Sequence, residues 1–97
     1  MRDFILEHSA RVRGVDGITY AARTYGSERA DGTWIAWLEF TPVGTMHPTL
    51  HTGQETSQPN RAAVEYWASG LEPVYLEGAL ARARSESQAA ERRPSSA

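Results

Sequence analysis

The chain contains no cysteine and no lysine, and it has no long apolar run. Without cysteine it can form neither a disulfide nor a thiolate metal site, and a small domain without disulfides is typical of a reducing compartment. No segment approaches the roughly 20 apolar residues of a membrane-spanning helix. The first residues, among them Arg2, Asp3 and Glu7, are too charged for a secretory signal. The sequence therefore predicts a cytoplasmic protein without a membrane partner.

The chain's 97 residues and its net charge of −2 limit its size and its partners. A chain of this length forms one domain with a thin core. The slight negative charge argues against strong nonspecific binding to nucleic acid, which depends on neutralising phosphates. All ten basic residues are arginine. A GC-rich coding bias is the favoured explanation, and the use of arginine for bidentate contacts with carboxylates or phosphates is the alternative.

Two segments, residues 18–25 and 33–41, are rich in β-branched and aromatic residues. Between them lies a polar stretch that ends in Asp31 and Gly32, a composition typical of a turn. The sequence therefore predicts a β-hairpin with a long loop. Residues 49–52 are expected to form a third strand. Residues 1–15 could be a flexible tail or could add an edge strand at residues 3–7.

Alternation within residues 33–41 sorts side chains between the two faces of the sheet. Trp34, Leu38 and Phe40 are expected to face the core. Ile35 and Trp37 are expected to face the other side, together with Glu39.

Two helices are expected after the strands. Ser57 and Pro59 are start signals for the first helix, and Val64, Trp67, Ala68 and Leu71 form an apolar stripe along it. Pro73 fits the first turn of the second helix. One side of this helix is lined by Tyr75, Leu76, Ala79, Leu80 and Ala83.

The predicted fold is α+β, with a three-stranded antiparallel sheet, or a four-stranded one if residues 3–7 join it, and two helices packed on one face. Residues 1–84 are expected to form the single domain. Residues 85–97 carry no apolar side chain larger than alanine, and a disordered tail is expected there, although Ala89 and Ala90 could extend the second helix in part.

The segment from Tyr20 to Phe40, with its acidic-glycine turn, resembles the opening of HicB-like antitoxin domains of bacteria. Residues 50–56, followed by a helix, are similar to that family's third strand and connector. The resemblance covers about residues 18–70, and it implies a small binding fold. The chain departs from the family after the second strand, where Pro42 and Gly44 occur without the usual cysteine, and no DNA-binding helix-turn-helix follows. The resemblance therefore does not imply operator binding. Residues 66–79 also resemble a stretch of small uncharacterised bacterial proteins.

Few residues suggest a catalytic or metal-binding site. His47, His51 and Glu55 have the four-residue spacing of a helical metal face, but Pro48 and the expected strand break that geometry. Asp31 and Glu39 could pair with Glu55 as acid–base carboxylates, although a turn, an outer sheet face and a helix start explain the three better. No catalytic residue, metal site or cofactor is therefore predicted, and the chain is not expected to be an enzyme.

The outer sheet face is the predicted partner-binding surface, with Arg23, Tyr25, Ile35 and Trp37 as its contact residues. Tryptophan, tyrosine and arginine are favoured in protein interfaces. The alternative that the second helix or the N-terminal segment covers this face stays open. A second candidate surface lies on the second helix, where Tyr75, Leu76 and Leu80 adjoin Arg82 and Arg84, although packing of this helix on its own sheet is favoured.

The sequence thus favours a nonenzymatic interaction module that binds a protein partner or forms a homodimer. A nucleic-acid-binding module, which would stack bases on the aromatic and arginine face, is the first alternative. A small metal-dependent hydrolase is the second.

Overall fold

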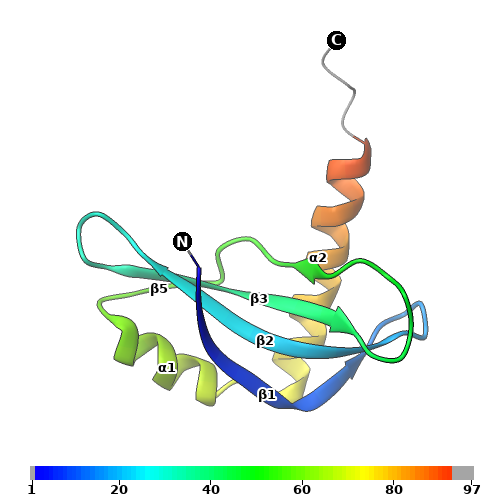
Figure 1. Cartoon of the computed structure of the whole chain (residues 1–97), viewed down its shortest axis with the longest axis horizontal. Coiled ribbons are helices and arrows are strands. Elements are labelled where there is room, and N and C mark those ends of the chain that lie inside the picture. The colour runs from blue at the N-terminus through cyan, green and yellow to red at the C-terminus, as the bar shows by residue number, and fades with distance from the viewer. Residues whose placement is uncertain (1, 93–97) are drawn as a thin grey trace.

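The computed structural model describes residues 2–92, and side chains through residue 89. The fold is α+β, as predicted, with a mainly antiparallel sheet and two helices. The elements follow in the order β1 (Asp3–Arg13), β2 (Thr19–Glu28), β3 (Trp34–Pro42), β4 (Leu50–His51), β5 (Thr56–Gln58), α1 (Arg61–Ser69) and α2 (Pro73–Arg92). The strands lie in the order β1-β2-β3-β4, and β5 also pairs with β3 (Figure 1).

The predicted hairpin is formed by β2 and β3, which pair in continuous register from Tyr20 opposite Pro42 to Glu28 opposite Trp34. The turn between them is held by Asp31. Its Oδ1 accepts hydrogen bonds from the Thr33 backbone N–H, at 2.9 Å, and from the Thr33 hydroxyl, at 2.6 Å. Gly32 has a φ of 87°, which glycine adopts without strain. Local turn chemistry therefore sets the register of the two central strands.

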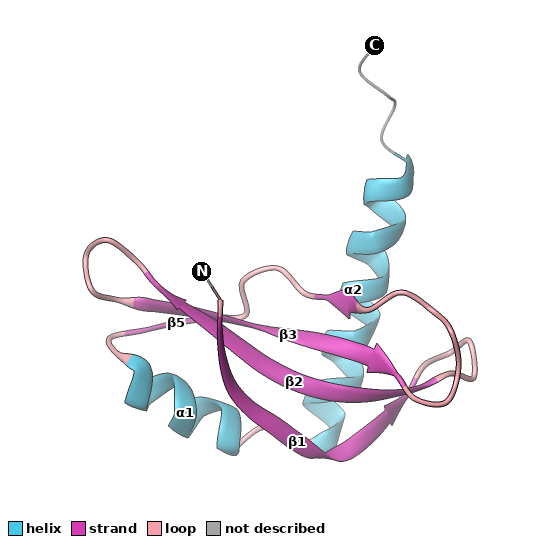
Figure 2. Cartoon of the chain, viewed as in Figure 1, coloured by secondary structure: helices cyan, strands magenta, loops and turns pink. Residues whose placement is uncertain are grey.

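The predicted alternation along β3 is confirmed. The side chains of Trp34, Ala36, Leu38 and Phe40 are buried, whereas Ile35, Trp37 and Glu39 are only partly buried. Both helices lie on the side of the buried set (Figure 2). The sheet therefore has one covered face, called the inner face here, and one outer face.

The N-terminal segment is a full strand. β1 pairs antiparallel with β2 from Asp3 to Arg13, which makes it longer than the residues 3–7 that were offered as an edge strand. Its register shifts between Phe4 and Leu6 and again between Glu7 and Arg11. The first shift breaks the alternation of exposure at residues 5 and 6, which is why residues 1–15 give no single strand pattern.

The other edge of the sheet is an interrupted strand made of β4 and β5. The predicted third strand at residues 49–52 shortens to Leu50–His51, and β5 was not predicted. Thr52 fills the gap, since its backbone N–H donates to Leu38 O at 2.9 Å and its Oγ1 accepts from Leu38 N–H at 3.0 Å. The Glu55 N–H then donates to Ala36 O at 2.8 Å. A side-chain oxygen thus replaces one backbone acceptor, and the pairing with β3 continues beyond it.

The start predicted for the first helix, at Ser57 to Pro59, is wrong. Ser57 belongs to β5, and α1 begins at Arg61. The N-cap is Asn60, whose side chain accepts the Ala63 N–H at 2.8 Å. Asparagine at this position satisfies an otherwise unpaired donor of the first turn, and it outcompetes the serine and proline signals upstream.

The predicted end of the second helix is also wrong. α2 begins at Pro73, as expected, but continues to Arg92, so residues 85–92 are helical and do not form a tail. The segment contains no proline or glycine and includes Ala89, which favours helix even without an apolar stripe. Residues 93–97 of the predicted tail lie outside the described residues.

The core has two clusters of buried residues on the inner face. The larger one lies under α2 and joins Tyr20, Leu38, Phe40 and Leu76 with smaller neighbours. The smaller one lies under α1 and contains Trp34, Ala36 and Val64. Each helix therefore covers its own part of the sheet.

The described residues include no helix that is both long enough and apolar enough to cross a membrane.

Candidate functional site

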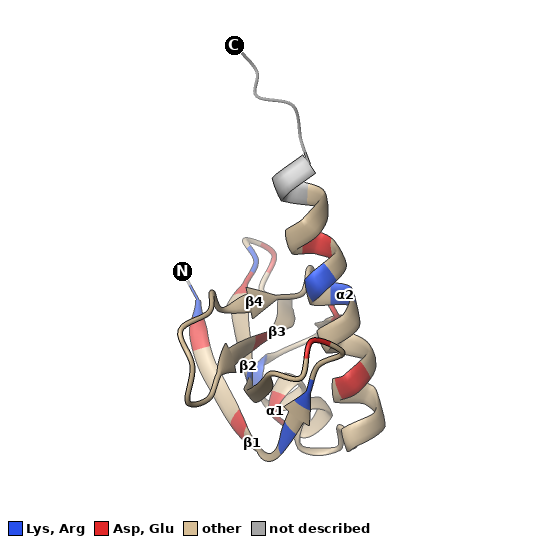
Figure 3. Cartoon of the chain, turned by 90° about the vertical axis from the view of Figure 1, so that its right-hand side faces the viewer, with Lys and Arg blue, Asp and Glu red and all other residues tan. Residues whose placement is uncertain are grey.

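The four residues predicted to bind a partner lie on the outer face of the sheet. Tyr25 is directly opposite Trp37 in the register of β2 and β3, and Arg23 is opposite Glu39. Ile35 lies two residues from Trp37 and is opposite Ser27. Figure 3 shows the sheet from its side, with α2 beside one face only. The structure therefore brings the four predicted residues together on a face that neither helix covers.

Two residues of the N-terminal segment extend this aromatic group. Phe4 meets Tyr25 edge-on, with ring centroids 5.8 Å apart and planes at 73°. The Arg2 guanidinium lies over the Tyr25 ring, 4.2 Å from its centroid. Sequence reasoning missed both residues, because the shifted register of β1 hides which of its side chains share a face with Tyr25. Arg2 and Phe4 thus pack on Tyr25 and cover part of the outer face.

The charges of the outer face are paired with one another. Arg2 forms an ion pair with Glu39, and Arg23 Nε donates to Glu7 Oε1 at 3.0 Å. Trp37 Nε1 donates to Glu39 Oε2 at 3.1 Å, which fixes the indole ring. We call the group of Arg2, Phe4, Glu7, Arg23, Tyr25, Ile35, Trp37 and Glu39 the aromatic face. Because two cations match two anions, the aromatic face has no net charge.

A shallow groove runs beside the aromatic face. It encloses about 370 Å³ and is lined by Ile35, Trp37, Glu39, His51, Gly53 and Gln54. Most of the surface that lines it is apolar, and its lining residues also include the polar Glu39, His51 and Gln54. This pattern suits an apolar side chain of a partner, with polar groups around it.

The three carboxylates considered for acid–base chemistry do not converge. Asp31 is bound in its turn, Glu39 lies on the aromatic face, and Glu55 reaches the second helix. The side chains of His47 and His51 are exposed. Among the described residues there is no group of three acidic or histidine side chains placed to hold a metal ion.

Glu55 is the center of a polar network that ties the interrupted edge strand to α2. Its carboxylate accepts hydrogen bonds from the Tyr75 hydroxyl and from Arg82 Nη2, both at 2.5 Å, and from Arg82 Nε at 3.2 Å. Burial alone would raise the pKa of Glu55, but these hydrogen bonds outweigh it and lower that pKa below its ordinary value. Burial and the bond to Glu55 raise the pKa of Tyr75 to about 12. The network is therefore ionised at Glu55 and structural in character.

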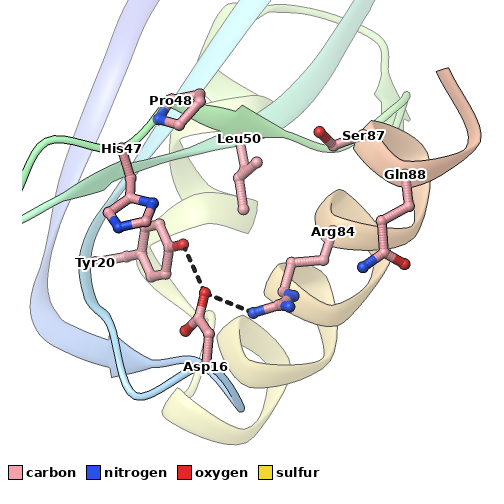
Figure 4. Close-up of a pocket in the computed structure, with 8 residues that line it drawn as sticks. All are labelled: Asp16, Tyr20, His47, Pro48, Leu50, Arg84, Ser87 and Gln88. Carbon is pink, nitrogen blue, oxygen red and sulfur yellow. Dashed lines mark hydrogen bonds and ion pairs between the residues drawn. The ribbon is translucent and has the colours of Figure 1, made fainter. Parts of the chain in front are cut away.

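A second polar cluster lies between the β1–β2 turn and α2 (Figure 4). Asp16 Oδ2 lies 2.6 Å from Arg84 Nη1 and accepts the Tyr20 hydroxyl at 3.2 Å. The pKa of Asp16 is lowered, first by the Ile18 N–H and then by Arg84 and Tyr20. A small pocket of about 200 Å³ opens beside the pair, with His47 and Gln88 on its wall. Because Asp16 neutralises the guanidinium, this cluster holds the turn to the helix and offers no free charge to a ligand.

The second helix packs on its own sheet, as favoured. Leu76 and Leu80 are buried in the larger core cluster, and Tyr75 packs against it. Arg82 and Arg84 bind Glu55 and Asp16. The apolar and basic residues of this helix are therefore used within the domain.

One buried titratable residue escaped the sequence reasoning. His8 lies on the inner side of β1, with its Nε2 2.7 Å from Thr24 Oγ1. Burial lowers the pKa of this imidazole. A single histidine between Glu7 and Ser9 gives no signal of burial in the sequence.

Comparisons of the chain with family models, curated proteins and solved structures found no match.

Proposed function

We propose that the chain is a nonenzymatic cytosolic interaction module that binds a protein partner through the aromatic face. The observation that carries this proposal is the cross-strand pair of Tyr25 and Trp37 on a face that both helices leave uncovered. Large aromatic side chains held rigidly on a sheet lose little conformational freedom on binding, which is why they dominate protein interfaces. The hairpin of β2 and β3, followed by a short strand and then a helix, keeps the element order on which the resemblance to HicB-like domains rests.

The charge pairing on the aromatic face supports a protein partner over a nucleic acid. Arg2 and Arg23 are both engaged with carboxylates of the same face. A phosphate backbone would have to displace Glu39 and Glu7 from these arginines. Binding to the aromatic face should therefore depend on apolar contact, and its salt dependence should be shallow.

The test begins with affinity purification from the native source, and the captured partner is then made as a pure protein. We expect Trp37→Ala to weaken binding by about 30-fold or more, the loss typical of a central interface residue. Tyr66→Ala is the matched control, because Tyr66 is an aromatic residue that is 83% exposed on α1. This control should leave the dissociation constant unchanged.

A folding control separates the two faces. Trp37→Ala should retain the circular dichroism spectrum of the wild type, whereas Trp34→Ala removes a buried ring and should destabilise the domain by about 3–5 kcal/mol. Unchanged partner binding by the folded Trp37→Ala protein would refute the proposal. A steep fall of affinity with salt, together with binding to short single-stranded oligonucleotides, would favour the nucleic-acid function instead.

A further inference from the structure

β1 has a strand neighbour along only one of its edges, because β1 is the first strand in the sheet order. It is also a long strand, with 11 residues. The opposite edge of the sheet is short and interrupted between β4 and β5. An edge of this length is a template for a further strand unless its charges prevent the pairing.

The charges along β1 are divided between its halves. Asp3 and Glu7 lie in the first half, and Arg11 and Arg13 lie in the second (Figure 3). Arg11 and Arg13 take part in no side-chain hydrogen bond or ion pair among the described residues, unlike Arg23 and the other arginines discussed above. An antiparallel copy of the same strand would place acidic halves against basic halves. This charge pattern favours pairing with a second copy of β1 over pairing with a strand that lacks the complementary charges.

The alternation of exposure along β1 limits the registers that such a pair can adopt. From residue 7 to residue 13, exposed and more buried side chains strictly alternate. Several symmetric registers keep this alternation and pair opposite charges, and the one centred on Ala10, for example, places Glu7 opposite Arg13. The register that places Ser9 opposite Ser9 is favoured here, because it adds an apolar pair to the charge pairs. It brings Glu7 of each copy opposite Arg11 of the other, and Leu6 opposite Val12. The small side chains of Ser9 and Ala10 lie at the center, where two copies would approach most closely.

We propose that the free edge of β1 pairs antiparallel with β1 of a second copy, in the register that centers on Ser9. Two Glu7–Arg11 pairs form on the outer side of the joined sheet. Opposite charges directly across two strands stabilise the pairing, and like charges there oppose it. The dimer goes beyond the proposed function, since it uses the edge of the sheet. Of the aromatic face it uses Glu7 alone, and it leaves Tyr25, Ile35 and Trp37 free in both copies.

A charge exchange tests this register. We expect sedimentation equilibrium of the full chain to show a monomer–dimer equilibrium. Arg11→Glu places like charges across the pair, twice per dimer, and should raise the dimer dissociation constant about tenfold or more. The double variant Glu7→Arg/Arg11→Glu should restore dimerisation. Arg13→Glu is the matched control, because it makes the same charge change on the same strand outside the Glu7–Arg11 pairs.

A crosslink tests the symmetry axis independently. The chain lacks cysteine, so Ser9→Cys introduces a single thiol at the position opposite itself. Residues directly opposite in an antiparallel pair have Cα atoms about 4.5–5.5 Å apart, within the range that a disulfide spans. Mild oxidation should therefore join two Ser9→Cys chains. Arg13→Cys, also exposed, should not crosslink, because the two copies of residue 13 lie at opposite ends of the paired segment.

The proposal is overturned if the wild type stays monomeric up to about 1 mM, or if Ser9→Cys crosslinks no better than Arg13→Cys. It is also overturned if Trp37→Ala abolishes self-association while Arg11→Glu leaves it intact, because the second copy would then occupy the aromatic face. The dimer proposal and the proposed function can be refuted independently of each other. Arg11→Glu does not alter the aromatic face, so partner binding by that variant reports on the proposed function alone.

Discussion

The bond between Glu55 and the second helix offers the sharpest test of what holds the domain together. The Glu55 carboxylate is 8% exposed and accepts three hydrogen bonds, one from Tyr75 and two from Arg82. Glu55→Gln keeps the size of the side chain but places an N–H₂ group where an acceptor stood. The Tyr75 hydroxyl or the Arg82 guanidinium then faces a donor instead of an acceptor.

The expected cost follows from the exposure of the partners. Hydrogen bonds to a charged group contribute about 1.5–3 kcal/mol each, but Arg82 is half exposed and regains water when it is released. We therefore expect the whole substitution to lower the free energy of unfolding by about 1.5–3 kcal/mol. In a domain of this size, that corresponds to a fall in Tm of roughly 6–24 °C.

Urea unfolding followed by circular dichroism at pH 7 measures this change. Glu65→Gln removes a carboxylate that is 53% exposed and pairs with Arg61 on the surface of α1, so this control should cost no more than about 0.5 kcal/mol. A double-mutant cycle of Glu55→Gln with Tyr75→Phe should give a coupling energy of at least about 0.5 kcal/mol. Equal stability of Glu55→Gln and wild type would show that the network adds nothing, and the reasoning would be wrong.

The stability that this network contributes also depends on pH. Because the folded pKa of Glu55 lies below its ordinary value of 4.5, its contribution is present above pH 4.5 and is lost as the pH falls through the folded pKa. The difference in stability between wild type and Glu55→Gln should therefore shrink as the pH falls below about 4.5. A difference that stayed constant down to pH 2 would contradict the lowered pKa.

Three further substitutions test separate features of the fold. A Cβ at Gly78, inside α2, would meet no atom closer than 3.5 Å, so Gly78→Ala should stabilise the protein by about 0.8–1 kcal/mol in urea unfolding; destabilisation would reveal a close contact. Thr52→Val leaves the Leu38 N–H without its acceptor and should cost about 1–3 kcal/mol, whereas Thr52→Ser should cost less; equal losses would point to the methyl group instead. Burial lowers the pKa of His8 below its ordinary value of 6.5, so the unfolded chain binds a proton at this residue more readily than the folded chain does. The free energy of unfolding should therefore fall as the pH drops below about 6.5. His8→Gln, which can still bond Thr24, should flatten this slope, and a slope unchanged in His8→Gln would assign it to other groups.

The central hairpin could be read from the sequence because every signal there agrees. Alternation along residues 33–41 is regular, and Asp31 and Gly32 mark the turn by their own chemistry. The assignment of Trp34 to the core and Trp37 to the outer side followed from a period of two. The grouping of Arg23, Tyr25, Ile35 and Trp37 on one face followed from the same period.

The edges of the sheet could not be read in this way. The register of β1 shifts twice, so its exposed and buried residues do not follow one alternation, and Phe4 and His8 escaped notice. In the β4–β5 edge, the Thr52 side chain takes the place of a backbone acceptor, which no periodicity reveals. Glu55 was assigned to a helix start because its true partners, Tyr75 and Arg82, are brought near it only by the tertiary fold.

Helix boundaries failed for local reasons. Three start signals, Ser57, Pro59 and Asn60, compete within four positions, and pairing of β5 with β3 decides among them. The lack of large apolar residues after Arg84 predicts a tail that begins too early, because α2 continues to Arg92. Polar residues with good helix propensity can extend a helix that is already anchored by Leu76 and Leu80.

The division of the core into two clusters has a consequence for how the protein opens. The cluster under α1 is small, and Trp34 is its one large, deeply buried side chain. The cluster under α2 joins residues from three strands to the first half of that helix. Amide hydrogens of α1 should thus exchange with solvent through partial openings that leave α2 and the middle of the sheet closed, and a protease that cuts such openings would find its first site around residues 59–72.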